Sequence, residues 1–209
     1  MALIVAGIIA AVALLAGAAW VFAVNRVETP DYVTVASEGD FEIRDYPPIV
    51  VAEVTRTGAR KAAVNSGFGA LAAYIFARDR AGEKISMTAP VTQQPVGKIA
   101  MTAPVTQTRQ TADSWIVQFV MPAKYRLGDL PAPGGPDVRL RQIPAQRRAA
   151  VRFSGVADDA LIARNEARLR EWMSARGLKP LSEPVYAYYN APFTPGFLRR
   201  NEVMFEIAR

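Results

Sequence analysis

The stretch Phe41-Glu-Ile-Arg-Asp-Tyr-Pro-Pro-Ile-Val-Val-Ala-Glu-Val-Thr-Arg-Thr-Gly58 returns 97 residues later, without a gap, as Val138-Arg-Leu-Arg-Gln-Ile-Pro-Ala-Gln-Arg-Arg-Ala-Ala-Val-Arg-Phe-Ser-Gly155. In each copy a proline, Pro47 or Pro144, separates two runs that are typical of strands. An apolar stripe at helical spacing then follows at the same offset in both copies. Its matching positions are Val64, Ala72, Ile75 and Phe76 in the first copy and Leu161, Leu169, Trp172 and Met173 in the second. The chain therefore looks duplicated, with halves of about 31–127 and 137–209.

Each half is predicted to hold two strands, a helix and further strands, with 115–121 and 203–207 as the final strands. Strands followed by a helix, twice, with mostly antiparallel pairing, indicate an α+β fold in which both helices pack outside one continuous sheet or open barrel. The segment Leu130-Pro-Ala-Pro-Gly-Gly-Pro136 is too rich in proline and glycine for a helix or a strand, so it is predicted to link the halves.

A shorter repeat lies inside the first half. The sequence Lys84-Ile-Ser-Met-Thr-Ala-Pro-Val-Thr-Gln93 recurs, nearly unchanged, at 98–107. Apolar residues alternate with polar ones in both copies, which predicts two half-buried strands. The loop Gln94-Pro-Val-Gly97 between them favours an antiparallel hairpin, in which Pro90 and Pro104 would lie at edges or bulges.

The two predicted helices differ in how well they follow local rules. The second has Asp158 and Asp159 near its start and Gly177 after its last turn, as helix ends favour. The first begins with Arg60 and Lys61, which oppose the helix dipole, and it carries Gly67 and Gly69 in its middle, where glycine is unfavourable. Such departures often mark function.

Composition excludes several kinds of chemistry. The 209 residues include no histidine and no cysteine, which rules out Ser-His-Asp and Cys-His catalysis, histidine-ligated metals, zinc fingers and disulfides. The net charge of +6 would suit an anionic partner, but a solvated surface is the favoured explanation, because acids are interspersed and no run of five basic residues occurs. No nucleic-acid-reading motif is present, so a nucleic-acid partner is not expected.

The first 24 residues are apolar except for two glycines, a length that can span a bilayer as a helix. We interpret residues 1–25 as a transmembrane anchor or signal-anchor, since the apolar run exceeds that of a secretory signal and no basic residue precedes it. A cleaved signal, with small residues at 16–19 as the cleavage region, is the alternative. The expectation is a single-pass protein of a bacterial inner membrane, with the side that holds the domain undetermined.

Three features suggest a ligand site. The glycines and alanines of the first helix would form a smooth apolar face, which suits either a flat ligand or tight packing on the sheet. Arg60 and Lys61 could receive a ligand carboxylate or could simply be solvated. Phe193, Phe197 and Leu198 lie on a loop rich in proline and glycine, where they could cover a pocket, bind a partner, enter lipid or fold back over the core. Arg199 and Arg200 could pair with a ligand acid or with Glu202.

Taken together, several motifs resemble the SOUL haem-binding protein family. They are the two Met-Thr-Ala-Pro-Val strings, Ile43-Arg-Asp-Tyr-Pro-Pro48 and Arg199-Arg-Asn-Glu-Val203, and the similarity extends from about Tyr32 to Ala208. The resemblance implies a haem-binding domain over 31–209, folded as a distorted antiparallel β-barrel of two pseudo-twofold repeats. It also implies that haem or another porphyrin binds in an apolar groove between the first helix and the loop before the last strand.

Carried onto this chain, the resemblance places the groove at seven residues, namely Phe68, Leu71, Ala72, Ile75, Phe193, Phe197 and Leu198. Arg60, Lys61, Arg199 and Arg200 would pair with the propionates. Because histidine is absent, an axial iron ligand would have to be Met, Tyr, Lys or water, and the ligand is left open. The expected function is that of a membrane-anchored protein, not an enzyme, that reversibly binds, buffers or transfers a tetrapyrrole.

Two other functions compete with this interpretation. The resemblance extends to effector-binding folds with hydrolytic relatives, which would make Glu202 a general base and Tyr188 a proton donor. A buried Glu202 with a raised pKa would support a hydrolase or effector-binding module, and a Glu202 paired with arginine would count against it. Alternatively, the aromatic loop would make the domain an interaction module for a protein or the bilayer.

Overall fold

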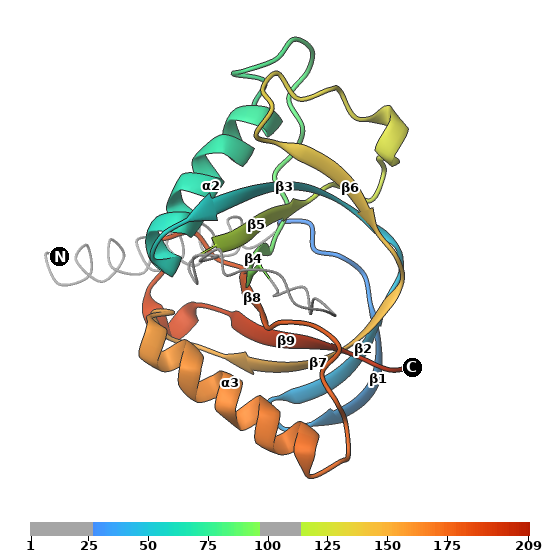
Figure 1. Ribbon diagram of the computed structural model, residues 1–209, viewed down its shortest axis with the longest axis vertical. Helices are drawn as coiled ribbons and strands as arrows, with labels where there is room; N and C mark the ends of the chain where they lie inside the picture. Colours follow the sequence, from blue (N-terminus) through green and yellow to red (C-terminus); the bar gives the residue numbers. More distant parts are fainter. Residues whose placement is uncertain (1–26, 97–113) are drawn as a thin grey trace, which may run out of the picture.

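The structure is a computed structural model, and it describes residues 27–96 and 114–209. Nine strands of these residues form one curved sheet, and two helices pack on its outer side (Figure 1). The strands are β1 (Val33–Glu38), β2 (Phe41–Tyr46), β3 (Ile49–Thr57), β4 (Val91–Pro95), β5 (Ser114–Val120), β6 (Arg139–Ile143), β7 (Gln146–Phe153), β8 (Val185–Tyr188) and β9 (Asn201–Ile207). The helices are α2 (Arg60–Ile75) and α3 (Asp159–Ser174), with short 3-10 turns η1 (Leu127–Asp129) and η2 (Gly196–Leu198).

The strand order reproduces the duplication seen in the sequence. The order is β1-β2-β7-β9-β8-β4-β5-β3-β6, and all pairs are antiparallel. If β1 is left aside, this order is symmetric. The strands β2, β7, β9 and β8 at one end correspond to β6, β3, β5 and β4 at the other end, and each strand is the counterpart, in the other half, of the strand at the mirrored place. The first strand of each half pairs with the second strand of the other, as β2 with β7 and β6 with β3. The prediction of an α+β fold made of two similar halves is confirmed.

The predicted closed barrel and the predicted membrane helix have different outcomes. The sheet is not closed into the distorted barrel that we expected, because β1 and β6 remain as its two edges. Within 27–96 and 114–209, neither helix is long and apolar enough to cross a bilayer. The predicted anchor at 1–25 lies outside the described residues.

The predicted hairpin between the two short repeats is wrong for the copy that the structure describes. Only Val91–Pro95 forms a strand, and β4 pairs with β5 on one edge and β8 on the other. Both edges of β4 are therefore taken by other strands. Pro90 precedes the strand, after a cis peptide bond with Ala89, and so takes no place in the ladder. The second copy, at 98–107 with Pro104, lies outside the described residues.

Each helix packs on the strands of its own half. Helix α2 contacts β3 and β5, and helix α3 contacts β7 and β9, so each half has its own apolar core on the outer face of the sheet. The predicted ends of α3 are confirmed: the carboxylate of Asp158 accepts a hydrogen bond from the Leu161 amide at 2.7 Å, and Gly177 follows the helix with a φ of 66°. Helix α2 has no side-chain cap at its start.

The two glycines inside α2 have different roles. A Cβ built on Gly67 would lie 2.7 Å from the Cβ of Val117 on β5, which is closer than packed atoms tolerate. Gly69 has nothing within 4 Å of the corresponding position. Gly67 therefore lets the helix pack tightly on the sheet, which is the structural alternative that the sequence left open.

This contrast predicts opposite effects for two alanine substitutions. Gly67→Ala should lower the free energy of unfolding by about 1–3 kcal/mol, because the added methyl overlaps a branched side chain that cannot move aside. Gly69→Ala should raise it by about 0.5–1 kcal/mol, because alanine is the better helix former. Denaturant unfolding of the two variants measures both effects, and equal effects would contradict the packing argument.

Candidate ligand-binding site

The inner, concave face of the sheet carries a buried ion pair that joins distant parts of the chain. Strand β2 directs Phe41 and Ile43 into the α3 core, so alternation places Arg44 on the opposite face. There the guanidinium of Arg44 donates to both carboxylate oxygens of Glu202, on β9, at 2.7 and 3.0 Å. Both side chains are almost completely buried.

Two further groups bind the carboxylate of this pair. The carboxylate of Glu202 accepts hydrogen bonds from Arg200 at 2.7 and 3.0 Å and from the Tyr189 hydroxyl at 2.8 Å. Burial alone would raise the pKa of Glu202, but its hydrogen bonds and charge interactions with Arg44 and Arg200 outweigh burial and hold the pKa below its ordinary value. Glu202 is therefore an ionised structural anion with every lone pair occupied, and the interpretation of Glu202 as a general base is wrong. Tyr188, its predicted proton donor, lies instead with Arg60 and Gln93.

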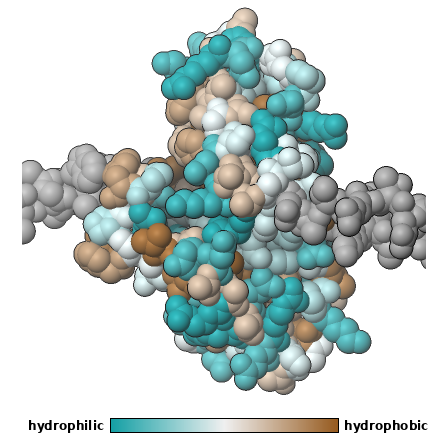
Figure 2. Space-filling model, turned by 60° about the vertical axis from the view of Figure 1, so that its left-hand side comes forward, coloured by the Kyte–Doolittle hydropathy of each residue, from teal (hydrophilic) through white to brown (hydrophobic). Residues whose placement is uncertain are grey.

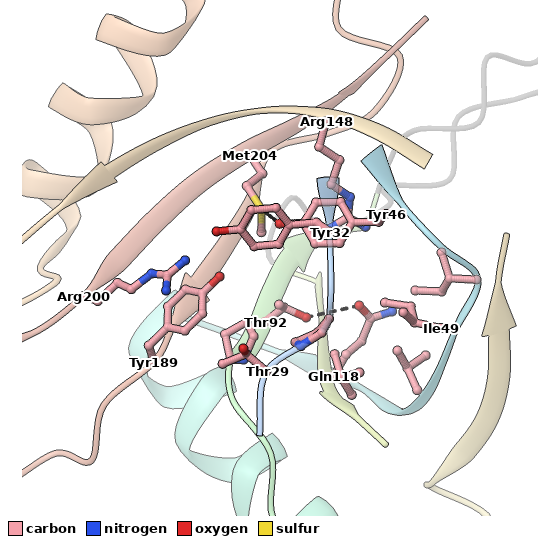
Figure 3. A pocket seen from close by; sticks show the side chains of 15 residues that line it. Thr29, Tyr32, Tyr46, Ile49, Thr92, Gln118, Arg148, Tyr189, Arg200 and Met204 are labelled. Carbon is pink, nitrogen blue, oxygen red and sulfur yellow. Dashed lines mark hydrogen bonds between the residues drawn. The ribbon is translucent and has the colours of Figure 1, made fainter. Parts of the chain in front are cut away.

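A cavity of about 30 Å³ opens beside this cluster on the concave face. Strands from both halves and the segment before β1 line it, and Figure 3 shows Tyr32 and Tyr46 on one side with Thr92 and Gln118 opposite. Of the eleven predicted site residues only Arg200 lines it; its full lining is Thr29, Pro30, Tyr32, Tyr46, Ile49, Val51, Pro90, Thr92, Gln118, Val120, Ile143, Arg148, Tyr189, Arg200 and Met204.

The predicted ligand face of α2 is mostly inside the protein. Leu71, Ala72 and Ile75 are buried, at 0%, 7% and 1% exposure, and Leu71 and Ile75 pack with β3 and β5 in the core of the first half. The prediction that these three residues form an open groove is therefore wrong. Phe68 is half-exposed and stands edge-on to Phe119, with ring centroids 5.2 Å apart.

The aromatic loop before β9 is exposed and does not fold back over the core, which decides between the alternatives that the sequence left open. Phe193 and Phe197 are 64% and 79% exposed, and Leu198 is also exposed. Val156 is also exposed and lies near this loop, because the amide of the adjacent Gly155 donates to the Gly196 carbonyl at 2.9 Å. We call Val156, Phe193, Phe197 and Leu198 the apolar patch. Figure 2 shows apolar residues at mid-height, among a largely hydrophilic surface.

The predicted propionate partners are mostly engaged within the protein. Arg60 binds Asp159 at 2.5 Å and the Tyr188 hydroxyl at 2.7 Å, which ties the start of α2 to the start of α3. Arg200 binds Glu202. Arg199 donates to the backbone carbonyls of Thr194 and Pro192, so its charge meets no carboxylate within 27–96 and 114–209. Lys61 is exposed at the first turn of α2.

A family model named "SOUL heme-binding protein" matches residues 27–206, which is most of the chain. The chain belongs to the SOUL haem-binding protein family. This is a family of binding proteins, and its description names haem as the ligand. No curated protein sequence matches the chain.

Solved structures support the fold at low sequence identity. The C-terminal domain of EcmrR is 12% identical, with a TM-score of 0.58, and the match covers 81% of this chain and 97% of that one. A structure described as a hydrolase from Listeria innocua is also 12% identical, with a TM-score of 0.53 and coverage of 83% and 94%. At this identity the likeness extends to the fold alone.

The concave cavity of this SOUL protein is too small for haem. It holds about two water-sized molecules, far less than a tetrapyrrole. The sequence has no histidine or cysteine to ligate the iron. Met121, Met173 and Met204 are buried, and of these three only Met204 lines the cavity.

The Glu202 cluster makes a testable contribution to stability. Glu202→Gln should lower the free energy of unfolding by about 3 kcal/mol at neutral pH, because it removes the buried carboxylate that Arg44 and Arg200 share. A carboxylate with a depressed pKa stabilises the folded state above its unfolded-state pKa and ceases to do so as the pH falls through its folded-state pKa. The difference between the wild type and the variant should therefore be constant near neutral pH and shrink below about pH 4.5, the ordinary value for Glu.

Denaturant unfolding between pH 3 and pH 7 measures this difference. Glu183→Gln is the matched control, because it removes one negative charge at an exposed position and should change stability by less than about 0.5 kcal/mol. A Glu202→Gln variant as stable as this control would contradict the role of the ion pair.

Proposed function

We propose that this protein binds a tetrapyrrole reversibly on its surface, at the apolar patch, and thereby buffers or transfers the ligand. Membership of a haem-binding family supports the ligand class. The observation that carries the location is the patch itself: two phenylalanines more than 60% exposed beside a guanidinium without a carboxylate partner. Exposed aromatic side chains of this kind occur where a protein meets a ligand or partner.

Each part of the patch has a distinct role in this proposal. Phe193, Phe197 and Leu198 contact the face of the macrocycle and remove it from water, with Phe68 on α2 as a further apolar contact. Arg199 pairs with a propionate, since its side chain bonds only carbonyl oxygens and retains its positive charge. Lys61 supplies a second cation to the same ligand.

Haem supplies iron chemistry when bound, but the sequence has no histidine or cysteine to ligate iron, and residues 190–200 include no methionine. Apolar contact and propionate pairing then provide the affinity, and both are available to a metal-free porphyrin. Binding without strong ligation allows rapid release. This favours a buffering or transfer role over that of a permanent cofactor, and it favours a binding protein over an enzyme.

A porphyrin titration tests the patch. Replacing both Phe193 and Phe197 by Ser should weaken porphyrin affinity about tenfold or more, because each ring contributes buried apolar area. Metal-free protoporphyrin should bind the wild type within about threefold of ferric haem, because iron ligation adds little. Absorbance and fluorescence titrations of the full-length chain measure both, with a protein-free sample in the same buffer as the blank.

Matched variants separate the patch from general effects. Leu181→Ser removes another exposed side chain and should leave the affinity unchanged. Arg199→Gln should weaken protoporphyrin binding but not binding of its dimethyl ester, which lacks carboxylates. Unchanged porphyrin affinity in the double phenylalanine variant, together with reduced binding to liposomes, would instead assign the patch to the bilayer.

We also propose that residues 1–25 anchor the protein in a membrane, as a single-pass protein of a bacterial inner membrane. The support is the apolar length of residues 2–24, which suffices for a bilayer. The full-length chain should stay in the membrane pellet after an alkaline carbonate wash, and a chain lacking 2–24 should be released. A full-length chain that shortens at 16–19 during expression would support a cleaved signal instead.

A further inference from the structure

Arg148 lines the concave cavity and forms no ion pair with a carboxylate of the described residues. It lies on β7, half-buried, and its Nε and Nη2 atoms both donate to the side-chain oxygen of Gln146, at 3.1 and 2.7 Å. Its guanidinium carbon lies 5.5 Å from the centre of the Tyr46 ring. Within 27–96 and 114–209, no carboxylate lies within 4.0 Å of its nitrogen atoms. Burial lowers the pKa of Arg148, as expected for a cation that lacks a direct counter-ion.

The other two arginines of this face are neutralised. Arg44 and Arg200 share Glu202, and Arg44 also pairs with Glu42 at 2.6 Å. Arg148 is opposite Glu206 in the β7–β9 ladder, but the Glu206 carboxylate accepts from the Gln146 amide at 3.0 Å instead. The side chain of Gln146 therefore bridges the guanidinium of Arg148 and the carboxylate of Glu206, which do not pair directly. The cavity is lined by a cation whose Nη1 atom forms no hydrogen bond with the described residues.

A second polar group of the cavity has spare capacity to donate. The hydroxyl of Tyr46 accepts a hydrogen bond from Arg44 at 3.2 Å, and its own proton points to the sulfur of Met204, 3.8 Å away. Thioether sulfur is a weak acceptor, so an oxygen anion would be a better partner for this proton. Figure 3 shows Arg148, Tyr46 and Met204 grouped at the same side of the cavity.

The side opposite Tyr46 has an apolar part beside Thr92 and Gln118, and the space is small. Ile49, Val51, Val120 and Ile143 line it. A volume of about 30 Å³ corresponds to about two water molecules, so a ligand of this cavity must be as small as a carboxylate with one or two carbons. A cation is disfavoured because the one buried carboxylate nearby, Glu202, already accepts from two arginines and a tyrosine.

We propose that the concave cavity is a binding site for a small monocarboxylate of the size of acetate, with its carboxylate on Arg148 and Tyr46 and its methyl group against the apolar part of the opposite side. This site lies on the opposite face of the sheet from the helices and shares no residue with the apolar patch. It would give the protein a second ligand, independent of the tetrapyrrole.

Titration with acetate, followed through the methyl signal of Met204, tests the proposal. The full-length chain is labelled with ¹³C-methyl methionine, Met204 is assigned by its loss in Met204→Leu, and ionic strength is held constant with chloride. We expect a saturable shift of the Met204 signal with acetate and none with acetamide, which has the same shape and no charge. Arg148→Gln should bind acetate at least about tenfold more weakly, because a charge-assisted hydrogen bond is lost.

Two further variants sharpen the result. Arg152→Gln removes the same charge from an exposed position of the same strand and should bind acetate like the wild type. Glu206→Gln should bind acetate more tightly, because it removes the competing anion, and it decides the matter if Arg148→Gln does not fold. Equal shifts with acetate and acetamide, no saturable shift, or weaker binding by Glu206→Gln would each overturn the proposal. Porphyrin affinity should be unchanged in Arg148→Gln, so the two sites succeed or fail separately.

Discussion

The ion pair between Arg44 and Glu202 is the constraint on which the concave face depends. Its partners are 158 residues apart and come from different halves, and each is almost completely buried. An ion pair removed from water is stable only when its remaining hydrogen-bonding capacity is satisfied, which explains why Arg200, Tyr189 and Glu42 gather around it. Arg44 also donates to the Tyr46 hydroxyl and lies over the ring of Tyr32, so the ion pair helps to position two tyrosines that line the cavity. Arg148, on the same face, has no carboxylate within 4.0 Å among residues 27–96 and 114–209.

Features that rest on short stretches of chain could be predicted from the sequence. The ends of α3 follow from Asp158 and Gly177, whose effects reach only one helical turn. The duplication could be predicted because it preserves the order of elements. The loop with Phe193 and Phe197 could be recognised as needing another surface, because it has no strand or helix of its own in which these rings could be buried. In each case the physical cause lies within a few residues of the feature.

Features that depend on pairing across the sheet could not be predicted. The sequence predicts a ligand face on the apolar stripe of α2. A helix packed on a sheet has one apolar face, however, and in α2 this face lies in the core, where Leu71 and Ile75 are buried. The cavity was missed because Arg148 on its own strand is indistinguishable from a solvated arginine. One signal was available: polar residues alternate with apolar ones in β2 and β9, and their polar sides must meet if both halves share a sheet.

The exchange of first strands between the halves has a consequence for the origin of the fold. Strands β2, β3 and β4 of the first half pair with β7, β6 and β8 of the second, so a chain ending after one repeat would leave three strand edges unsatisfied. Such a peptide could bury those edges only by associating with a second copy around a twofold axis. The architecture is thus that of an intertwined homodimer joined into one polypeptide.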